Sequence, residues 1–257
     1  MLSFQQSKYM NTPSSAAFTV SEVLKASWDI TKKSWKKYLI LLGAAALLLL
    51  GFSILFGILE GVIGIPDLIE DILSFLLGIY VGIVMVKGAL VIVRDQKFDL
   101  SELIKVDSKM YLHMLLATFL FYLVVLLGFV LLIIPGIIAS LMFCFYSYSI
   151  VDKNADAIQS LEDSKNMTDG SKWTIFLFNL CLSLIAFVIV AVPMIILATM
   201  SVGVGFSNAG VGPAILVGIL GMIVVIAIAA VLSMVGMSGQ AYMYTKLRAK
   251  TPLAIKK

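Results

Sequence analysis

Six long apolar runs restrict the fold of this chain more than any other feature of its sequence. Backbone amide and carbonyl groups must be hydrogen-bonded inside hydrocarbon, so such runs form α-helices unless they close into a β-barrel. A barrel requires apolar and polar residues to alternate, and these runs show no alternation. The sequence therefore predicts an all-α, polytopic membrane helical bundle with about six transmembrane helices. The predicted spans cover residues 38–59, 72–93, 111–134, 137–150, 173–200 and 214–244.

The composition supports the same class of protein. Apolar residues make up 61% of the 257 residues and charged residues only 13%, whereas soluble domains carry about 25% charged residues. Six spans of roughly 20 residues each leave no length for an attached soluble domain. We expect one six-span domain over residues 18–250, with a flexible lead-in at 1–17 and a basic tail at 251–257. The net charge of +4 gives no reason to expect a nucleic-acid partner.

The positions of the charged residues predict the orientation. Every Lys and Arg except Lys87 lies before the first run, between runs two and three, between runs four and five, or after the sixth. The opposite connections carry acidic residues or no charge at all. Basic residues accumulate on the cytosolic side of membrane proteins. We therefore expect a multi-pass protein of the cytoplasmic membrane with both termini in the cytosol.

An amphipathic helix is predicted over residues 19–37. Thr19 and Glu22 have the spacing of a capping box at a helix start. Aromatic and lysine residues then follow at helical spacing, and Trp28 and Trp35 would anchor the helix at the headgroup boundary. The alternative is that this helix packs on the cytosolic end of the bundle. Trp173, at the start of the fifth run, is a third interface anchor.

The fourth run is too short for an ordinary span. Pro135 and Gly136 interrupt the apolar sequence and predict a hairpin tip, because Pro cannot continue a helix and Gly relaxes the backbone. Charged residues follow an aromatic collar, as expected for a helix that leaves the lipid. The collar consists of Phe143, Phe145, Tyr146 and Tyr148. We expect a helix over 137–150 that is re-entrant, mismatched to the bilayer or extended by the collar.

Two weak repeats connect distant segments. A constant shift pairs Pro135 with Pro193 and Phe129 with Phe187. A second match compares two amphipathic segments, in which Leu24, Ser27, Thr31 and Ser34 have the same spacing as Leu161, Ser164, Thr168 and Ser171. The matches predict three units, each a surface helix followed by a two-span hairpin, unless they only reflect the abundance of apolar residues.

No catalytic or metal-binding pattern stands out. The sequence has no GxSxG, HExxH, P-loop or GxGxxG motif, and its only histidine is His113. Cys144 and Cys181 lie in apolar runs, away from a metal-ligand cluster. We expect no catalytic residue, no metal and no cofactor. The acidic residues after the collar are expected to keep a surface helix solvated, namely Asp152, Asp156, Glu162, Asp163 and Asp169.

Three polar residues inside the spans are candidates for an intramembrane site: Lys87, Asn179 and Gln240. Lys87 lies near the cytosolic end of its span, so its ammonium either reaches the headgroups or faces the bundle interior and binds an anionic group. Asn179 and Gln240 are expected to form hydrogen bonds between helices. The GxxxG spacings at residues 57–61 and 78–82 allow close packing, either within the bundle or between two copies of the chain.

The segment from Leu127 to Phe176 carries a resemblance to a known family. Its sequence LGFVLLIIPGII, followed by aromatic residues and IVDKNADAIQSLEDSKNMTDGSKWTIF, resembles the YciC-like family of prokaryotic six-span membrane proteins. It also resembles the membrane domain fused to some glycerophosphoryl diester phosphodiesterases. The matching positions are Pro135, Gly136, Val151, Asp152, Leu161, Ser164, Gly170 and Trp173. The resemblance implies a six-span fold and no particular activity, because the phosphodiesterase reaction belongs to a separate barrel of roughly 250 residues.

These observations favour a non-enzymatic protein that organises the membrane, assists another protein or contacts lipid. Its expected partners are the bilayer, anionic lipid headgroups, and a membrane protein or a second copy of the chain. The alternative is a transporter or flippase for an amphiphilic substrate, with Lys87 at its anionic group.

Overall fold

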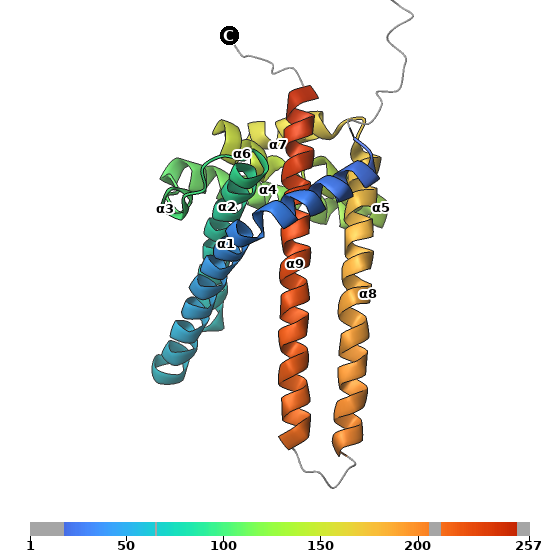
Figure 1. Ribbon diagram of the computed structural model, residues 1–257. Helices are drawn as coiled ribbons and strands as arrows, with labels where there is room; N and C mark the ends of the chain where they lie inside the picture. The colour runs from blue at the N-terminus through green and yellow to red at the C-terminus, as the bar shows by residue number, and fades with distance from the viewer. Residues whose placement is uncertain (1–17, 65, 206–211, 251–257) are drawn as a thin grey trace, which may run out of the picture.

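The computed structural model describes residues 18–64, 66–205 and 212–250, and every regular element in these residues is a helix (Figure 1). Six segments are long and apolar enough to cross a membrane, with α5 and α6 counted as one. The chain is therefore an all-α, multi-pass membrane protein, as predicted. The lead-in at 1–17 and the tail at 251–257 lie outside the described residues. The helices are α1 (Val20–Ile63), α2 (Asp67–Val93), α3 (Leu100–Leu103), α4 (Ser108–Leu131), α5 (Ile133–Met142), α6 (Tyr146–Lys153), α7 (Ala157–Thr168), α8 (Lys172–Gly205) and α9 (Gly212–Lys250).

Two long hairpins, α1–α2 and α8–α9, meet at one end and splay apart at the other (Figure 1). The largest buried cluster lies where they meet and includes Phe145, Tyr148, Phe178 and Tyr244. Further along the hairpins the apolar side chains are exposed, for example Leu47 with 74% of its surface accessible. Such surfaces are stable only against hydrocarbon, so the bundle is held together mainly at the end that carries the basic residues.

The amphipathic helix and the first span form one bent helix, α1. Thr19 caps its start by accepting a hydrogen bond from the amide of Glu22 at 3.2 Å, as the capping spacing predicts. The helix bends at Ser34, whose φ of −121° and ψ of 18° are not helical. The boundary between the interfacial helix and the first span, predicted between residues 37 and 38, therefore lies slightly C-terminal to the observed bend. Figure 1 shows the N-terminal part of α1 crossing α9 and α8, with the rest running alongside α2.

A buried hydroxyl on α9 holds this bend. Ser238 Oγ lies 3.0 Å from Thr31 Oγ1 and donates to the Tyr38 hydroxyl at 2.7 Å. Thr31 precedes the bend and Tyr38 follows it, so one side chain connects both arms of α1 to α9. All three residues are buried. The angle between the surface part and the spanning part of α1 is therefore set by contacts with the last helix.

The predicted fourth span at 137–150 is not one helix. It is divided into α5 and α6, and a side chain of α7 forms hydrogen bonds with the backbone at the break. Ser164 Oγ donates to the carbonyl of Met142 at 2.8 Å and accepts from the amide of Phe145 at 3.0 Å. These bonds satisfy backbone groups that the break would leave unpaired. Phe145 and Tyr148, expected in an aromatic collar at the headgroups, are buried in the core instead.

The hairpin tip lies at Leu132, before the predicted tip at Pro135 and Gly136. Leu132 is extended, with φ −167° and ψ 155°, and α5 begins directly after it. Pro135 fits the first turn of α5, where the amide hydrogen that it lacks would have no helical partner. Gly136 provides close packing rather than a turn, since a Cβ added at Gly128 would lie 2.9 Å from its Cα.

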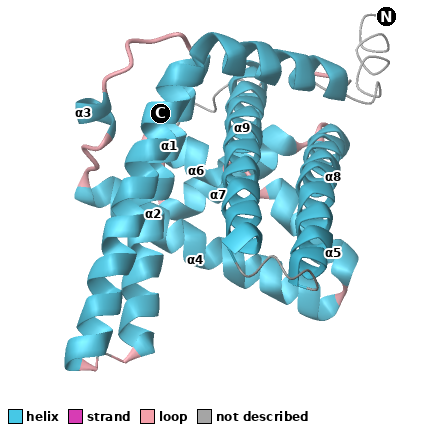
Figure 2. Cartoon of the chain, turned by 60° about the horizontal axis from the view of Figure 1, so that its bottom comes forward, coloured by secondary structure: helices cyan, strands magenta, loops and turns pink. Residues whose placement is uncertain are grey.

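The α4–α5 hairpin lies crosswise to the long hairpins, on the side of their basic ends, in both views (Figures 1 and 2). The middle of the three predicted units therefore differs from the outer two. Its surface helix, α3, has only four residues. The outer units share their pattern of burial, because the matched hydroxyl residues Ser27, Thr31, Ser34, Ser164, Thr168 and Ser171 are all buried.

Candidate functional site

Lys87 points toward the surface at the basic end. Its Nζ donates a hydrogen bond to the backbone carbonyl of Lys105, in the loop between α3 and α4, at 2.5 Å. This geometry is that of a lysine reaching out of its span. The interpretation in which the ammonium faces the bundle interior does not fit this contact.

Asn179 and Gln240 are brought together between α8 and α9. Gln240 Nε2 donates to Asn179 Oδ1 at 2.8 Å, and Asn179 Nδ2 donates to the carbonyl of Ile175 at 2.9 Å. Gln240 Oε1 is buried and has no hydrogen-bond partner among the residues that the structure describes. The pair is the interhelical hydrogen bond that the sequence predicts, and it does not include Lys87.

The N-terminal part of α1 presents what we call the basic interfacial face: Lys25, Trp28, Lys32, Trp35 and Lys36. Trp28 and Trp35 are 46% and 49% exposed. Lys32 Nζ lies 5.2 Å from the centroid of the Trp28 ring, and Lys36 Nζ lies 5.8 Å from that of Trp35. None of the three lysines forms a salt bridge within residues 18–64, 66–205 and 212–250.

The two sequence-based interpretations of this helix apply to different faces of it. Its small residues, Ser27, Thr31 and Ser34, are buried, which is the predicted packing on the end of the bundle. The tryptophans flank this strip and remain outside. Trp173, at the start of α8, is also exposed and stacks on Phe176 with ring centroids 5.3 Å apart.

Asp152 is the centre of a charged cluster that was not predicted from the sequence. Its side chain is only 6% exposed, although it was expected to keep a helix surface solvated. Arg94 donates to both carboxylate oxygens, at 2.6 and 2.9 Å, and the Tyr244 hydroxyl donates at 3.0 Å. Arg248 forms a further salt bridge to the same carboxylate. The Asp152 cluster therefore ties α6 to the end of α2 and to α9.

One signal in the sequence could have revealed this cluster. Arg94 and Arg248 are the only two arginines of the chain, and both contact the one carboxylate. Arginine is suited to bidentate pairing with a carboxylate where water is scarce. The hydrogen bonds from Arg94 to Asp152 raise the pKa of the Arg94 guanidinium above its ordinary value, since the carboxylate stabilises the charged form.

The other acidic residues of this segment have mixed roles. Asp156 caps α7 by accepting from the amide of Gln159 at 2.8 Å. Asp163 accepts from the hydroxyl of Ser149 at 2.8 Å and pairs with Lys153 at 3.0 Å. Asp156, Glu162 and Asp169 are exposed, so the expected solvation of the surface holds for these three residues.

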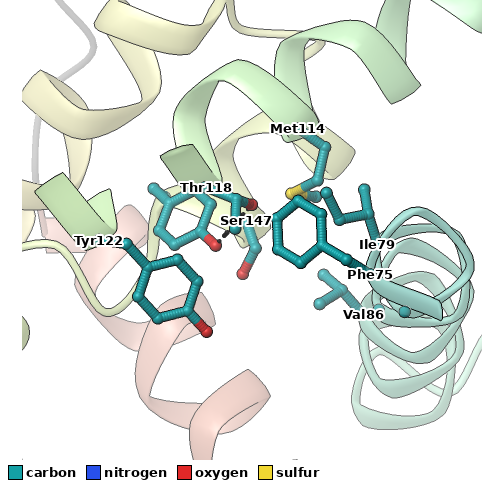
Figure 3. Close-up of a pocket in the computed structure, with 10 residues that line it drawn as sticks. Phe75, Ile79, Val86, Met114, Thr118, Tyr122 and Ser147 are labelled. Carbon is teal, nitrogen blue, oxygen red and sulfur yellow. Dashed lines mark hydrogen bonds between the residues drawn. The ribbon is translucent and has the colours of Figure 1, made fainter. Parts of the chain in front are cut away.

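A cavity of about 360 Å³ lies between α2 and α4, with α6 at its back (Figure 3). The α2 side contributes Gly78 and Gly82, where an added Cβ would meet no atom of the described residues within 4 Å. Gly57 and Gly61 of α1 likewise have no atom of the described residues within 4 Å of an added Cβ. The GxxxG glycines thus do not serve helix packing inside this bundle. The remaining lining residues are Phe75, Ile79, Val86, Met114, Thr118, Tyr122, Tyr146 and Ser147.

Hydroxyl groups gather on the wall of this cavity. Thr118 Oγ1 and the Tyr146 hydroxyl lie 3.0 Å apart and share a hydrogen bond. Tyr122 and Ser147 complete the polar wall (Figure 3). None of these residues was predicted as part of a site, because the candidates inside the spans were limited to charged and amide side chains. Hydroxyls within an apolar run were the available signal.

A second hollow, of about 500 Å³, lies beneath Trp28 between α8 and α9. Its walls are almost entirely aliphatic and include Leu182, Ile185 and Val231. In the part of the chain that the structure describes, no group of three or more His, Cys, Asp or Glu could hold a metal ion.

Comparison with known proteins adds no relative. No family model, curated protein or solved structure matches this chain.

Proposed function

We propose that this integral membrane protein is a non-enzymatic, lipid-contacting component of the cytoplasmic membrane that holds anionic headgroups on the basic interfacial face of α1. Both chain ends lie on the cytosolic side in this proposal. One observation carries it: the helix that crosses α8 and α9 has two exposed tryptophans and three lysines that form no salt bridge among the described residues. A helix with this composition lies in the headgroup layer, where each basic residue contributes about 1 kcal/mol toward an anionic surface.

The hollow beneath Trp28 supports the same function. A phospholipid with its phosphate at Lys25 and Lys32 would place an acyl chain next to the aliphatic walls of that hollow. Trp28 borders both regions and so lies at the boundary between headgroup and chain. Tryptophan prefers this boundary because its ring is apolar and its indole N–H needs a polar partner.

The decisive experiment measures which lipids remain bound to the purified protein. The chain is reconstituted in nanodiscs of equal parts phosphatidylglycerol and phosphatidylcholine, extracted gently and analysed by native mass spectrometry. We expect enrichment of phosphatidylglycerol that weakens with salt, because the interaction is electrostatic. Substitution of Lys25, Lys32 and Lys36 by Gln should abolish the enrichment.

A matched triple variant gives the control. Lys97, Lys109 and Lys165 are exposed lysines that make no cation–π contact with a tryptophan in the described part of the chain, and their replacement by Gln changes the net charge equally. Equal loss in the two variants would show a general charge effect and refute a site on α1. Absence of enrichment in the unmodified protein would refute the function itself.

A second candidate is transport of an amphiphile, and the cavity between α2 and α4 favours it. Lys87 is then not the substrate contact, because its ammonium is bound to the Lys105 carbonyl. A flux assay in proteoliposomes with fluorescent lipids tests this candidate: transport that is lost when the cavity is filled supports it, and no flux above that of protein-free vesicles excludes it.

We also propose membership of the YciC-like group, on the structural roles of its matching residues. Asp152 holds two arginines, Ser164 bridges the break between α5 and α6, and Gly170 adopts a φ of 73° that favours glycine. Each role depends on its residue type, so a family relationship predicts the same three residue types in homologous chains.

A further inference from the structure

We propose that the cavity between α2 and α4 is a binding site for an uncharged amphiphile, one that carries a hydroxyl or carbonyl group on a long apolar chain. This inference is independent of the anionic-lipid site on α1, because the two sites share no residue. It rests on the shape of the cavity, on its unused hydrogen-bonding groups, on the absence of charge in its walls and on its opening toward the lipid.

The shape fits part of a lipid. A volume of about 360 Å³ falls within the roughly 300–1,000 Å³ that small-molecule pockets occupy. Gly78 and Gly82 make one wall flat, because neither position carries a side chain. Ile79 and Val86 of α2 and Met114 of α4 provide the apolar contacts around it (Figure 3). A hydrocarbon chain can therefore lie directly against the backbone of α2.

The polar wall has hydrogen-bonding capacity that the protein does not use. Ser147 Oγ forms no hydrogen bond within the described part of the chain. In the pair between Thr118 and Tyr146, one hydroxyl donates to the other, and the accepting hydroxyl keeps its own proton free. A ligand with one hydroxyl or carbonyl oxygen could accept from this wall, and a hydroxyl could also donate to Ser147.

The uncharged walls of the cavity disfavour ionised ligands. None of the ten lining residues is charged. An unpaired phosphate or ammonium in an apolar site loses its hydration without compensation, whereas a neutral hydroxyl needs only one or two hydrogen bonds. The nearest basic side chain in the sequence, Lys87, is engaged by the Lys105 carbonyl. The cavity therefore suits diacylglycerol-like lipids better than phospholipids.

In this proposal the cavity opens toward the bilayer. Phe75 and Tyr122 line the cavity and are 46% and 59% exposed, on two helices that are long and apolar enough to cross a membrane. A ligand dissolved in the membrane can enter between α2 and α4 without first passing through water.

The glycines make the proposal testable without damage to the fold. Because a Cβ at Gly82 meets nothing within 4 Å, a side chain can begin there without moving the backbone, and Gly82→Leu places its bulk in the cavity. Leucine is also a better helix former than glycine. Gly51→Leu is the matched control, since Gly51 is a helical glycine of α1 in equally open surroundings and does not line the cavity. Ser147→Ala removes only the unused hydroxyl.

The experiment uses two photoreactive probes with identical acyl chains, a diacylglycerol and the corresponding phosphatidic acid. The full-length protein is irradiated with each probe in phosphatidylcholine nanodiscs, and labelled peptides are identified by mass spectrometry. We expect the diacylglycerol to label residues 75–86 and 114–122, with competition by unlabelled diacylglycerol. Labelling should be lost in Gly82→Leu and unchanged in Gly51→Leu. Ser147→Ala should weaken apparent affinity about threefold to tenfold, the effect of one neutral hydrogen bond.

Three results would overturn the proposal. Equal labelling by phosphatidic acid would show that the site does not select uncharged ligands. Labelling that persists in a Gly82→Leu protein with normal thermal unfolding would place the lipid outside the cavity, as contact with bulk lipid only. Absence of competable labelling at these peptides would show that the cavity does not bind this class. None of these results bears on the basic face of α1.

Discussion

Replacing Asp152 with Asn should destabilise the protein more than any other single charge removal at the basic end. The two side chains have nearly the same size, so the substitution leaves no cavity. It removes the negative charge that Arg94 and Arg248 share and replaces one acceptor oxygen with a donor NH₂ group. Four donor groups from three side chains, one at the end of α2 and two on α9, converge on that carboxylate. After substitution they face an amide that cannot satisfy them all.

The size of the effect follows from burial. Removing one member of a buried ion pair costs about 3–5 kcal/mol when the remaining charge stays buried. The Asp152 side chain is 6% exposed, but Arg94 and Arg248 keep 23% and 34% of their side-chain surface accessible. Water can therefore solvate part of the remaining charge, and we expect a loss of about 2–4 kcal/mol in the free energy of unfolding.

Thermal unfolding in detergent measures this change. For a chain of this length each kcal/mol lowers Tm by about 2–4 °C, so Asp152→Asn should lower Tm by about 4–16 °C. Asp169→Asn is the control, because Asp169 pairs with Lys172 at 3.2 Å and is 80% exposed. An exposed pair contributes about 0–1 kcal/mol, so this variant should unfold close to the unmodified protein.

A second substitution tests the reason for the loss. In the Asp152→Asn background, Arg248→Gln removes one of the charges that has lost its partner and should recover part of the lost stability. The reasoning is refuted if Asp152→Asn and Asp169→Asn lower Tm equally. It is also refuted if Arg248→Gln adds its full destabilisation to that of Asp152→Asn, since independent effects would mean that the two side chains do not interact.

Further predictions concern the bend, the crosswise hairpin and one exposed carboxylate. Ser238→Ala should cost about 1–3 kcal/mol in thermal or denaturant unfolding, because the two buried hydroxyls that it bridges lose their partner. Gly128→Ala should cost about 1–3 kcal/mol, since its Cβ would lie 2.9 Å from Gly136 Cα, whereas Gly43→Ala, in open space, should not destabilise. The pKa of Asp99 lies below its ordinary value because the Ser101 hydroxyl donates a hydrogen bond to its carboxylate. Its titration by NMR should therefore have a lower midpoint than that of an aspartate in an unstructured peptide, and its contribution to the α3 cap should be lost only as the pH falls through that midpoint.

Sequence-based prediction failed where the structure depends on contacts between residues that are distant in the sequence. The sequence predicts a turn at Pro135 and Gly136 and a helix over 137–150, and it gives no sign of the break between α5 and α6. Its position depends on Ser164 of α7, whose hydroxyl bridges Met142 and Phe145. The hairpin tip lies at Leu132 and not at the predicted Pro135 and Gly136. Pro135 is compatible with a first helical turn, and Gly136 allows close packing on α4.

The candidate sites show the same limit. Asn179 and Gln240 were each predicted to form hydrogen bonds between helices, because an amide in hydrocarbon must find a partner. Only the structure shows that they pair with each other. The hydroxyl wall of the α2–α4 cavity was missed, since Thr118 and Ser147 are unremarkable along the chain. They form one surface only when α4 and α6 meet behind the glycines of α2.

The sequence by itself determined that this chain is a multi-pass helical membrane protein whose basic segments cluster away from its acidic loop. Those properties depend on local hydrophobicity and on the need of each helix to satisfy its own backbone. Tertiary structure alone decided that α1 bends at Ser34, that α4 and α5 lie crosswise and that one carboxylate holds both arginines. Arg94, Asp152 and Arg248 lie far apart in the sequence, and their attraction acts only after packing has excluded most of the water between them.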